Sequence, residues 1–412
     1  MVQSAFGFCV LIALAWALSE NRWRVGLRPV LGGLALQIGL AALFLSVPQL
    51  QEGLNVVNRA VIALADATRA GTSFVFGFLG GGPLPYDEKV PGASFNLAFQ
   101  ALPQVVVVSA LSSLLFYWKI LPAVVRALSW VLQRVMGIGG AVGISAAATI
   151  FIGMVEAPLL CRPYLKQMSR GEIFVVMSTG MATIAGTVMV IYATMLAKVI
   201  PNSGGNILLA SLINAPAAIV VAKLMIPDHT APTGGTMIAP EPAASSIDAI
   251  AKGTASGVHL LINIVAFLLV LVALVYMANQ LLGLLPEAGG HALTLQRILG
   301  YVMAPVCWLM GIPWSEAQVA GGLMGTKTIL NEFIAYLDLA SLPPEALSVR
   351  SRVIMTYAMC GFANLGSLGI LIGGLGTMAP ERSRDIVSLG PRAIVSGTLA
   401  TCMSGAVVGV FS

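Results

Sequence analysis

Two carboxylates are unusual in this sequence because they fall in the middle of long apolar segments. Of the 17 Asp and Glu residues, all but Glu156 and Glu332 lie in loops, amphipathic stretches or helix ends. An ionisable group inside a bilayer costs about 2.5–3.5 kcal/mol on insertion scales, so it usually has a partner or a function. Both residues are therefore candidates for binding a polar substrate or a coupling proton. The alternative is a structural pair with a lysine or with the free amides of a helix N-terminus.

Further polar side chains accompany each carboxylate along the chain. After the second one, Asn364 and Ser367 share a helix face, and Phe362 just before them could pack on a flat ring. Near the first one, Thr149 and Thr183 could join the carbonyls of a broken helix to coordinate a small hard cation. The alternatives are ordinary contacts between helices, and threonine hydroxyls bonded back to their own helices.

The composition requires that membrane helices position these residues. The chain has 412 residues, of which 58% are hydrophobic and 9% charged, with a mean hydropathy of +0.91. An average soluble domain is about 25% charged, so a soluble enzyme, a disulfide scaffold and a disordered protein are excluded. The apolar runs are continuous rather than alternating, which excludes a β-barrel. The net charge of +5 is explained by the excess of basic residues in the cytoplasmic loops of membrane proteins, so no nucleic-acid partner is expected.

The apolar pattern predicts an all-α, multi-pass membrane protein with eight transmembrane helices. Two of these are interrupted at mid-length by small or polar residues, and they lie at residues 173–197 and 353–375. The other six are expected at residues 6–18, 30–47, 105–121, 207–226, 260–282 and 394–410. The less apolar segments 54–72, 120–135 and 246–258 are amphipathic and are expected to lie in the interface, or otherwise to be linkers.

Two other apolar segments, residues 142–165 and 316–337, have a polar break in the middle and are expected to be re-entrant helical hairpins. A broken helix and then a spanning helix follow each hairpin. With Arg22, Arg24 and Arg28 in the cytoplasm, the two copies have opposite orientations, which is an inverted repeat. Interrupted segments at matching positions of two halves indicate the substrate site of a secondary transporter.

Three motifs resemble those of the concentrative nucleoside transporter family. Residues 153–164 (GMVEAPLLCRPY) are similar to its first hairpin, residues 325–336 (GTKTILNEFIAY) to its second, and residues 360–364 (CGFAN) to its seventh helix. The resemblance runs from about residue 6 to the C-terminus, in the eight-helix bacterial form. It implies a homotrimer in which a scaffold domain holds an elevator-like transport domain.

The resemblance also implies a division of the chain. Residues 1–135 would be mainly scaffold, with N-terminal and interfacial helices. Residues 136–226 would be the first transport repeat, 227–300 a loop, an interfacial helix and a scaffold helix, and 301–412 the second transport repeat.

The resemblance further implies roles for individual residues. Glu332, Asn364 and Ser367 would bind the ribose hydroxyls, Phe362 would contact the nucleoside, and Glu156 would hydrogen-bond the base. A sodium site would use Thr149 and Thr183, with carbonyls from Ile152 and Ile184.

Two departures from the family pattern bear on selectivity and coupling. Met154 and Val155 replace the usual Gln-Thr, so weaker or different base selectivity is expected. Thr149 stands where sodium-coupled members have Asn. We therefore favour proton coupling, with Glu156 as carrier, slightly over sodium, which is the only metal ion expected.

The sequence thus predicts a symporter that takes nucleosides into a bacterial cell across the inner membrane, with no cofactor and no enzymatic activity. Its expected partners are nucleosides, the lipid bilayer and other copies of the chain. The alternatives are a cation-coupled transporter of another polar metabolite, such as a nucleobase, and an intramembrane hydrolase that uses the two carboxylates.

Overall fold

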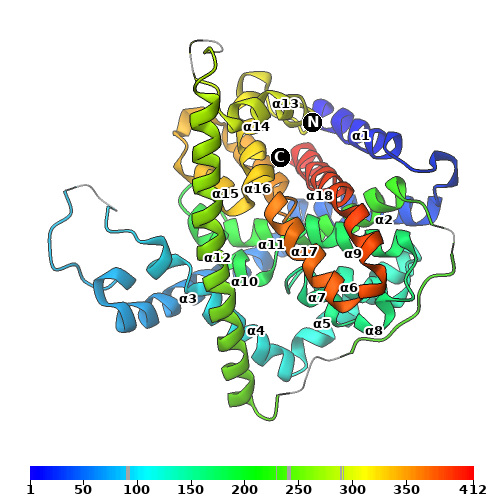
Figure 1. Cartoon of the computed structure of the whole chain (residues 1–412), viewed down its shortest axis with the longest axis horizontal. Helices are drawn as coiled ribbons and strands as arrows, with labels where there is room; N and C mark the ends of the chain where they lie inside the picture. Colours follow the sequence, from blue (N-terminus) through cyan, green and yellow to red (C-terminus); the bar gives the residue numbers. More distant parts are fainter. Residues whose placement is uncertain (90–92, 229, 239–242, 288–289, 291) are drawn as a thin grey trace.

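The computed structural model describes all residues except 90–92, 229, 239–242, 288–289 and 291, and the regular elements of the described part are all helices (Figure 1). Within these described residues, six helical segments are long and apolar enough to cross a membrane. Three shorter apolar helices accompany them, α1 (Val2–Ala17), α13 (Leu295–Leu309) and α17 (Leu365–Met378). The expected all-α membrane fold is confirmed.

Five of the six long segments lie outside the two hairpins and their broken helices. These are α2 (Leu27–Ser46), α4 (Gln104–Tyr117) with the preceding π-helical turn Leu97–Ala101, α11 (Ser203–Met225), α12 (Ser246–Leu282) and α18 (Ser383–Phe411). The amphipathic segments at 54–72 and 120–135 are helical, as α3 (Pro48–Phe76) and α5 (Ile120–Met136). Short 3-10 turns lie at Arg22–Arg24, Gly77–Gly80, Pro344–Ala346 and Pro380–Arg382.

The first hairpin and its broken helix lie where the sequence predicts them. The hairpin runs through α6 (Gly140–Ala148), an irregular tip, α7 (Glu156–Leu159) and α8 (Arg162–Leu165). The broken helix is α9 (Arg170–Ala182) followed by α10 (Gly186–Leu196). A capping box begins α9, because Ser169 accepts from the amide of Glu172 and the Glu172 carboxylate accepts in return from the amide of Ser169.

The second hairpin and its broken helix repeat this order. The hairpin consists of α14 (Trp314–Ile329) and α15 (Glu332–Ser341), and the broken helix consists of α16 (Val349–Met359) and α17. An asparagine with extended backbone begins the helix after each break: Asn331 accepts from the amide of Ile334, and Asn364 accepts from the amide of Ser367. Asparagine is among the best N-cap residues because its oxygen satisfies an otherwise free amide.

The prediction of a separate interfacial helix at 246–258 is wrong. Residues 246–282 form one continuous helix, α12, which stands as a long rod in Figure 1. Asp248 and Lys252 form an i, i+4 ion pair at its first turns, and Gly253 packs against the backbone of α4 at Ala110. The polar residues of this segment thus lie at an exposed helix end, and its small residues allow a close contact with α4. The helix continues into the apolar part because nothing in the sequence breaks it before residue 260.

The loop after α11 is attached to the first hairpin and to α9. Thr233 donates from its amide to Glu172 at 2.8 Å, and Ile238 donates to the carbonyl of Leu160 at 2.9 Å. Residues 229 and 239–242 of this loop lie outside the described residues. Asp228 accepts hydrogen bonds from Ser169 and Thr230; burial alone would raise its pKa, but these bonds and the charge of Lys223 hold that pKa below its ordinary value. Its contribution to folding is therefore present at neutral pH and is lost as the pH falls through the lowered pKa.

Replacing Glu172 with Ala is expected to lower the stability of the folded protein by about 1–3 kcal/mol. The substitution removes the capping box of α9 and both bonds from Thr233. Thermal unfolding of the purified protein in detergent would measure the loss. Glu381→Ala is the control, because Glu381 is exposed and has no hydrogen-bond partner among the described residues. Equal melting temperatures for the two variants would contradict the assignment.

Candidate substrate and cation site

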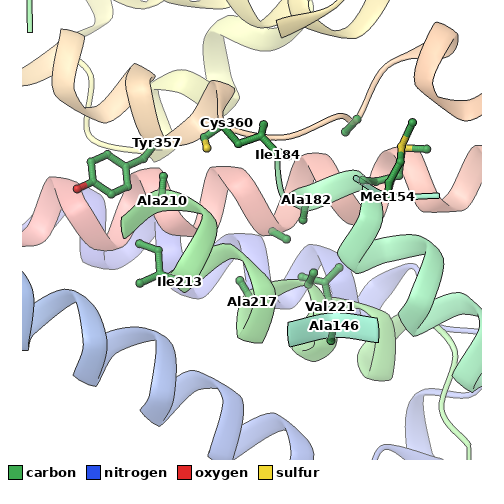
Figure 2. Packing of buried hydrophobic residues seen from close by; sticks show 14 of the residues in the cluster. Ala146, Met154, Ala182, Ile184, Ala210, Ile213, Ala217, Val221, Tyr357 and Cys360 are labelled. Carbon is green, nitrogen blue, oxygen red and sulfur yellow. The ribbon is translucent and has the colours of Figure 1, made fainter. Parts of the chain in front are cut away.

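The breaks in the two broken helices meet backbone to backbone. The amide of Phe362 donates to the carbonyl of Thr183 at 3.3 Å. A Cβ on Gly361 would lie 2.8 Å from the carbonyl oxygen of Ala182, so this crossing excludes a side chain at position 361. Figure 2 shows Cys360, from the second break, beside Ile184, from the first. The polar groups released by both breaks therefore lie at one place in the core.

Three residues proposed from the sequence for a substrate site are brought together at this crossing. Glu332 is the first residue of α15, and only 4% of its surface is exposed. The side-chain nitrogen of Asn364 donates to Glu332 Oε2 at 3.0 Å, and Asn364 Oδ1 accepts from the amide of Ser367 at 2.7 Å. Because its oxygen caps α17, Asn364 must present its nitrogen to the carboxylate. Phe362, partly buried, precedes this cluster.

Tyr192 completes the cluster, and the sequence analysis did not find it. Its hydroxyl donates to Glu332 Oε1 at 2.7 Å from the broken helix of the other repeat. Its ring lies 5.0 Å from that of Tyr336 and 6.0 Å from that of Phe333. A tyrosine within an apolar helix needs a buried hydrogen-bond partner for its hydroxyl, so the sequence indicates that Tyr192 has such a partner. Its partner lies 140 positions away in the sequence, so the spacing could not identify it.

If Glu332 contacts the substrate, Tyr192→Phe is expected to weaken substrate affinity by roughly 5–30-fold, the equivalent of about 1–2 kcal/mol for one hydrogen bond to a charged group. The ring contacts are retained, so the fold is expected to persist. Isothermal titration of the purified protein would measure the change. Tyr336→Phe is the matched control, since its hydroxyl donates to the carbonyl of Thr356 and not to Glu332. Unchanged affinity in Tyr192→Phe would exclude a role for this contact in binding.

The tip of the first hairpin is organised differently from the second. Glu156 is exposed, lies against Gly153, and forms no hydrogen bond or ion pair with any residue that the structure describes. Met154 is buried against Gly180 of α9, and Val155 packs on Gly374 of α17. The two apolar residues therefore hold the hairpin tip against both broken helices. The two carboxylates, equivalent in the sequence pattern, thus differ in environment, because α7 is a single turn whereas α15 is a regular helix.

The candidate cation ligands also cluster where hairpin and broken helix meet. The amide of Gly186 donates to the carbonyl of Phe151 at 2.9 Å, which places the segments of Ile152 and Ile184 together. The hydroxyls of Thr149 and Thr183 are buried and donate to the carbonyls of Ala146 and Thr179, both at 2.9 Å.

The back-bonding alternative for the two threonines is therefore realised, although each hydroxyl oxygen keeps lone pairs that can accept a cation. In the described ranges, no group of three or more His, Cys, Asp or Glu residues could hold a metal ion.

Comparison with known families identifies the family of this chain. One family model, described as the N-terminus of Na+ dependent nucleoside transporters, matches residues 6–79, and its C-terminal counterpart matches residues 206–409. A third, described as nucleoside recognition, matches residues 98–199. Nucleoside permease NupC of Helicobacter pylori is 36% identical, with 99% of this chain and 97% of that protein covered. The chain belongs to the concentrative nucleoside transporter family.

Structures and more distant relatives agree with membership of this family. A structure of CNTnw in an inward-facing substrate-bound state matches with a TM-score of 0.91 at 37% identity, over 100% of this chain and 98% of that one. Human solute carrier family 28 member 3 is 34% identical over 98% of this chain, which covers 59% of that relative. These relatives are transporters and permeases rather than enzymes. The sequence-based assignments of a transporter family and a multi-pass membrane protein are confirmed.

Proposed function

We propose that this protein is a cation-coupled symporter that takes up nucleosides across a bacterial inner membrane. The observation that carries the proposal is the buried cluster of Glu332, Asn364 and Ser367 at the crossing of two broken helices. A buried carboxylate beside an amide can receive the two hydroxyls of a ribose, and a free nucleobase lacks those hydroxyls. Phe362 would contact the nucleoside, and Glu156 would hydrogen-bond its base.

Selectivity for the base would depend on the first hairpin tip. Met154 and Val155 offer only apolar surface where the family resemblance implies two polar groups, so discrimination among bases would rest on Glu156 and on shape.

The coupling ion is proposed to be a proton carried by Glu156. Two observations support this: the Glu156 carboxylate is exposed and free of described partners, and Thr149 stands where the family resemblance implies an asparagine in sodium-coupled members. Sodium, held by Thr149, Thr183 and the carbonyls of Ile152 and Ile184, is the second candidate, because the matching family models are described as Na+ dependent.

The proposed assembly is a homotrimer with an elevator mechanism. The scaffold would comprise residues 1–135 and the helix within 227–300, while residues 136–226 and 301–412 would form the moving unit. Most of the large apolar side chains of α12 are exposed, which leaves one side of this helix free to contact lipid or another copy.

Uptake of labelled uridine and adenosine into proteoliposomes tests the function. A pH gradient and a sodium gradient are imposed separately, and free uracil and adenine serve as competitors. Accumulation driven by the pH gradient is expected. Accumulation driven by sodium alone would replace the proton proposal, and inhibition by the free bases equal to that by the nucleosides would indicate a nucleobase transporter instead.

A further inference from the structure

A lysine is buried in the second hairpin, close to the proposed substrate site. Lys327 lies near the C-terminal end of α14, and none of its surface is exposed. Its ammonium group donates to the carbonyl of Ala358 at 2.9 Å and to the hydroxyl of Thr401 at 3.0 Å. These bonds join the hairpin to the end of α16 and to α18, but neither partner carries a charge.

A buried ammonium group needs a compensating charge, because an isolated ion in a low-dielectric interior is very costly. Glu332 lies on the same hairpin, just beyond the break, and is buried as Lys327 is. The two side chains also hold the two sides of one break in the following helix, because Lys327 bonds to Ala358 before it and Glu332 accepts from Asn364 after it. The other titratable groups around the two residues are thiols and phenols, which are neutral near pH 7. They are Cys360, Cys402, Tyr192, Tyr336 and Tyr357. Asp338, further along α15, is exposed.

We propose that Lys327 is a positioning residue that keeps Glu332 ionised by supplying a fixed counter-charge within the same hairpin. This rests on the proposed role of Glu332 in binding the nucleoside. Two donors already point at the Glu332 oxygens, and a carboxylate accepts from them while retaining lone pairs for the substrate hydroxyls. A protonated carboxyl group would lose part of this acceptor capacity.

The proposal has a consequence for coupling. Lys327 and Glu332, both buried, are neutral as a pair when both are ionised. The affinity of Glu332 for substrate would then not require protonation or a nearby cation. The coupling proton or cation would then have to bind elsewhere, at the first hairpin.

A simpler role is that Lys327 only caps the C-terminal end of α16. Its bond to the carbonyl of Ala358 fits that role, since cations stabilise helix C-termini. The two roles predict different results when the charge on Glu332 is removed. The contribution of a helix cap would stay the same, whereas that of a counter-charge would change.

The first experiment measures nucleoside binding against pH for wild type, Lys327→Met and Lys198→Met. Lys198 is exposed and has no hydrogen-bond partner among the described residues, so it is the matched control. In Lys327→Met the lone carboxylate would take up a proton. Relative to wild type, binding is expected to weaken and then to recover by up to about tenfold per pH unit as the pH rises. A pH profile parallel to that of wild type would overturn the proposal.

The second experiment needs no nucleoside and therefore separates this proposal from the proposed function. Thermal unfolding is compared for wild type, Lys327→Met, Glu332→Gln and the double variant. If the charges compensate each other, each single variant is destabilised and the double variant recovers much of the loss, because replacing both members of a buried pair is far less costly than replacing one. Additive losses, or a double variant that folds no better than Lys327→Met, would leave Lys327 as a helix cap only.

Discussion

Glu332→Gln is expected to reduce nucleoside binding by at least roughly 100-fold, which corresponds to about 3 kcal/mol. The change removes the charge, so the hydrogen bond that Asn364 donates at 3.0 Å becomes one between neutral groups. Glutamine also has one oxygen where glutamate has two. When that oxygen accepts from Asn364, the amide nitrogen faces Tyr192, whose hydroxyl donates to Glu332 at 2.7 Å and would have to turn to accept. The variant therefore offers fewer acceptor positions to the ribose hydroxyls.

Titration of uridine into the purified protein would measure this effect, and uptake into proteoliposomes would show its consequence for transport. Asp338→Asn is the matched control, because it makes the same type of change on the same helix at an exposed position. Near-normal uptake by Glu332→Gln would remove the ribose assignment.

Asn364→Asp is expected to abolish nucleoside binding at neutral pH and to restore part of it in acid. Aspartate is a good N-cap residue, so the start of α17 should be preserved. However, the substitution replaces the donor to Glu332 with a second carboxylate at hydrogen-bond distance. Two carboxylates this close cannot both remain ionised, so the pair would share one proton as the pH falls. The shared proton would re-form a hydrogen bond between the two residues.

Binding measured at several pH values would test the direction of this pH dependence, since the affinity for nucleoside should rise as the pH is lowered. Asn96→Asp is the control, because Asn96 is also an N-cap residue that uses only its side-chain oxygen, at the turn Leu97–Ala101. Binding by Asn364→Asp that is independent of pH would show that the side-chain nitrogen of Asn364 is not needed at Glu332.

The helical segments and their breaks were largely predictable from the sequence. Apolar length, capping residues and interruptions by small or polar residues are local properties, and they located both hairpins and both broken helices. The main error, at 246–258, arose because amphipathic composition was taken to mean an interfacial position. A helix end that carries an ion pair and packs closely on α4 has the same composition.

The class of the protein, its two carboxylates and their companions Asn364 and Ser367 are evident without any structure, because a polar group in an apolar segment is conspicuous. The hydrogen-bond partners of those groups depend on how the helices pack. Tyr192 reaches Glu332 from a segment 140 positions away, Lys327 finds its partners on Ala358 and Thr401, and Glu156 stays exposed whereas Glu332 is buried. Burial and partner choice depend on which segments pack together, and packing across the two repeats is not encoded in the spacing of either one.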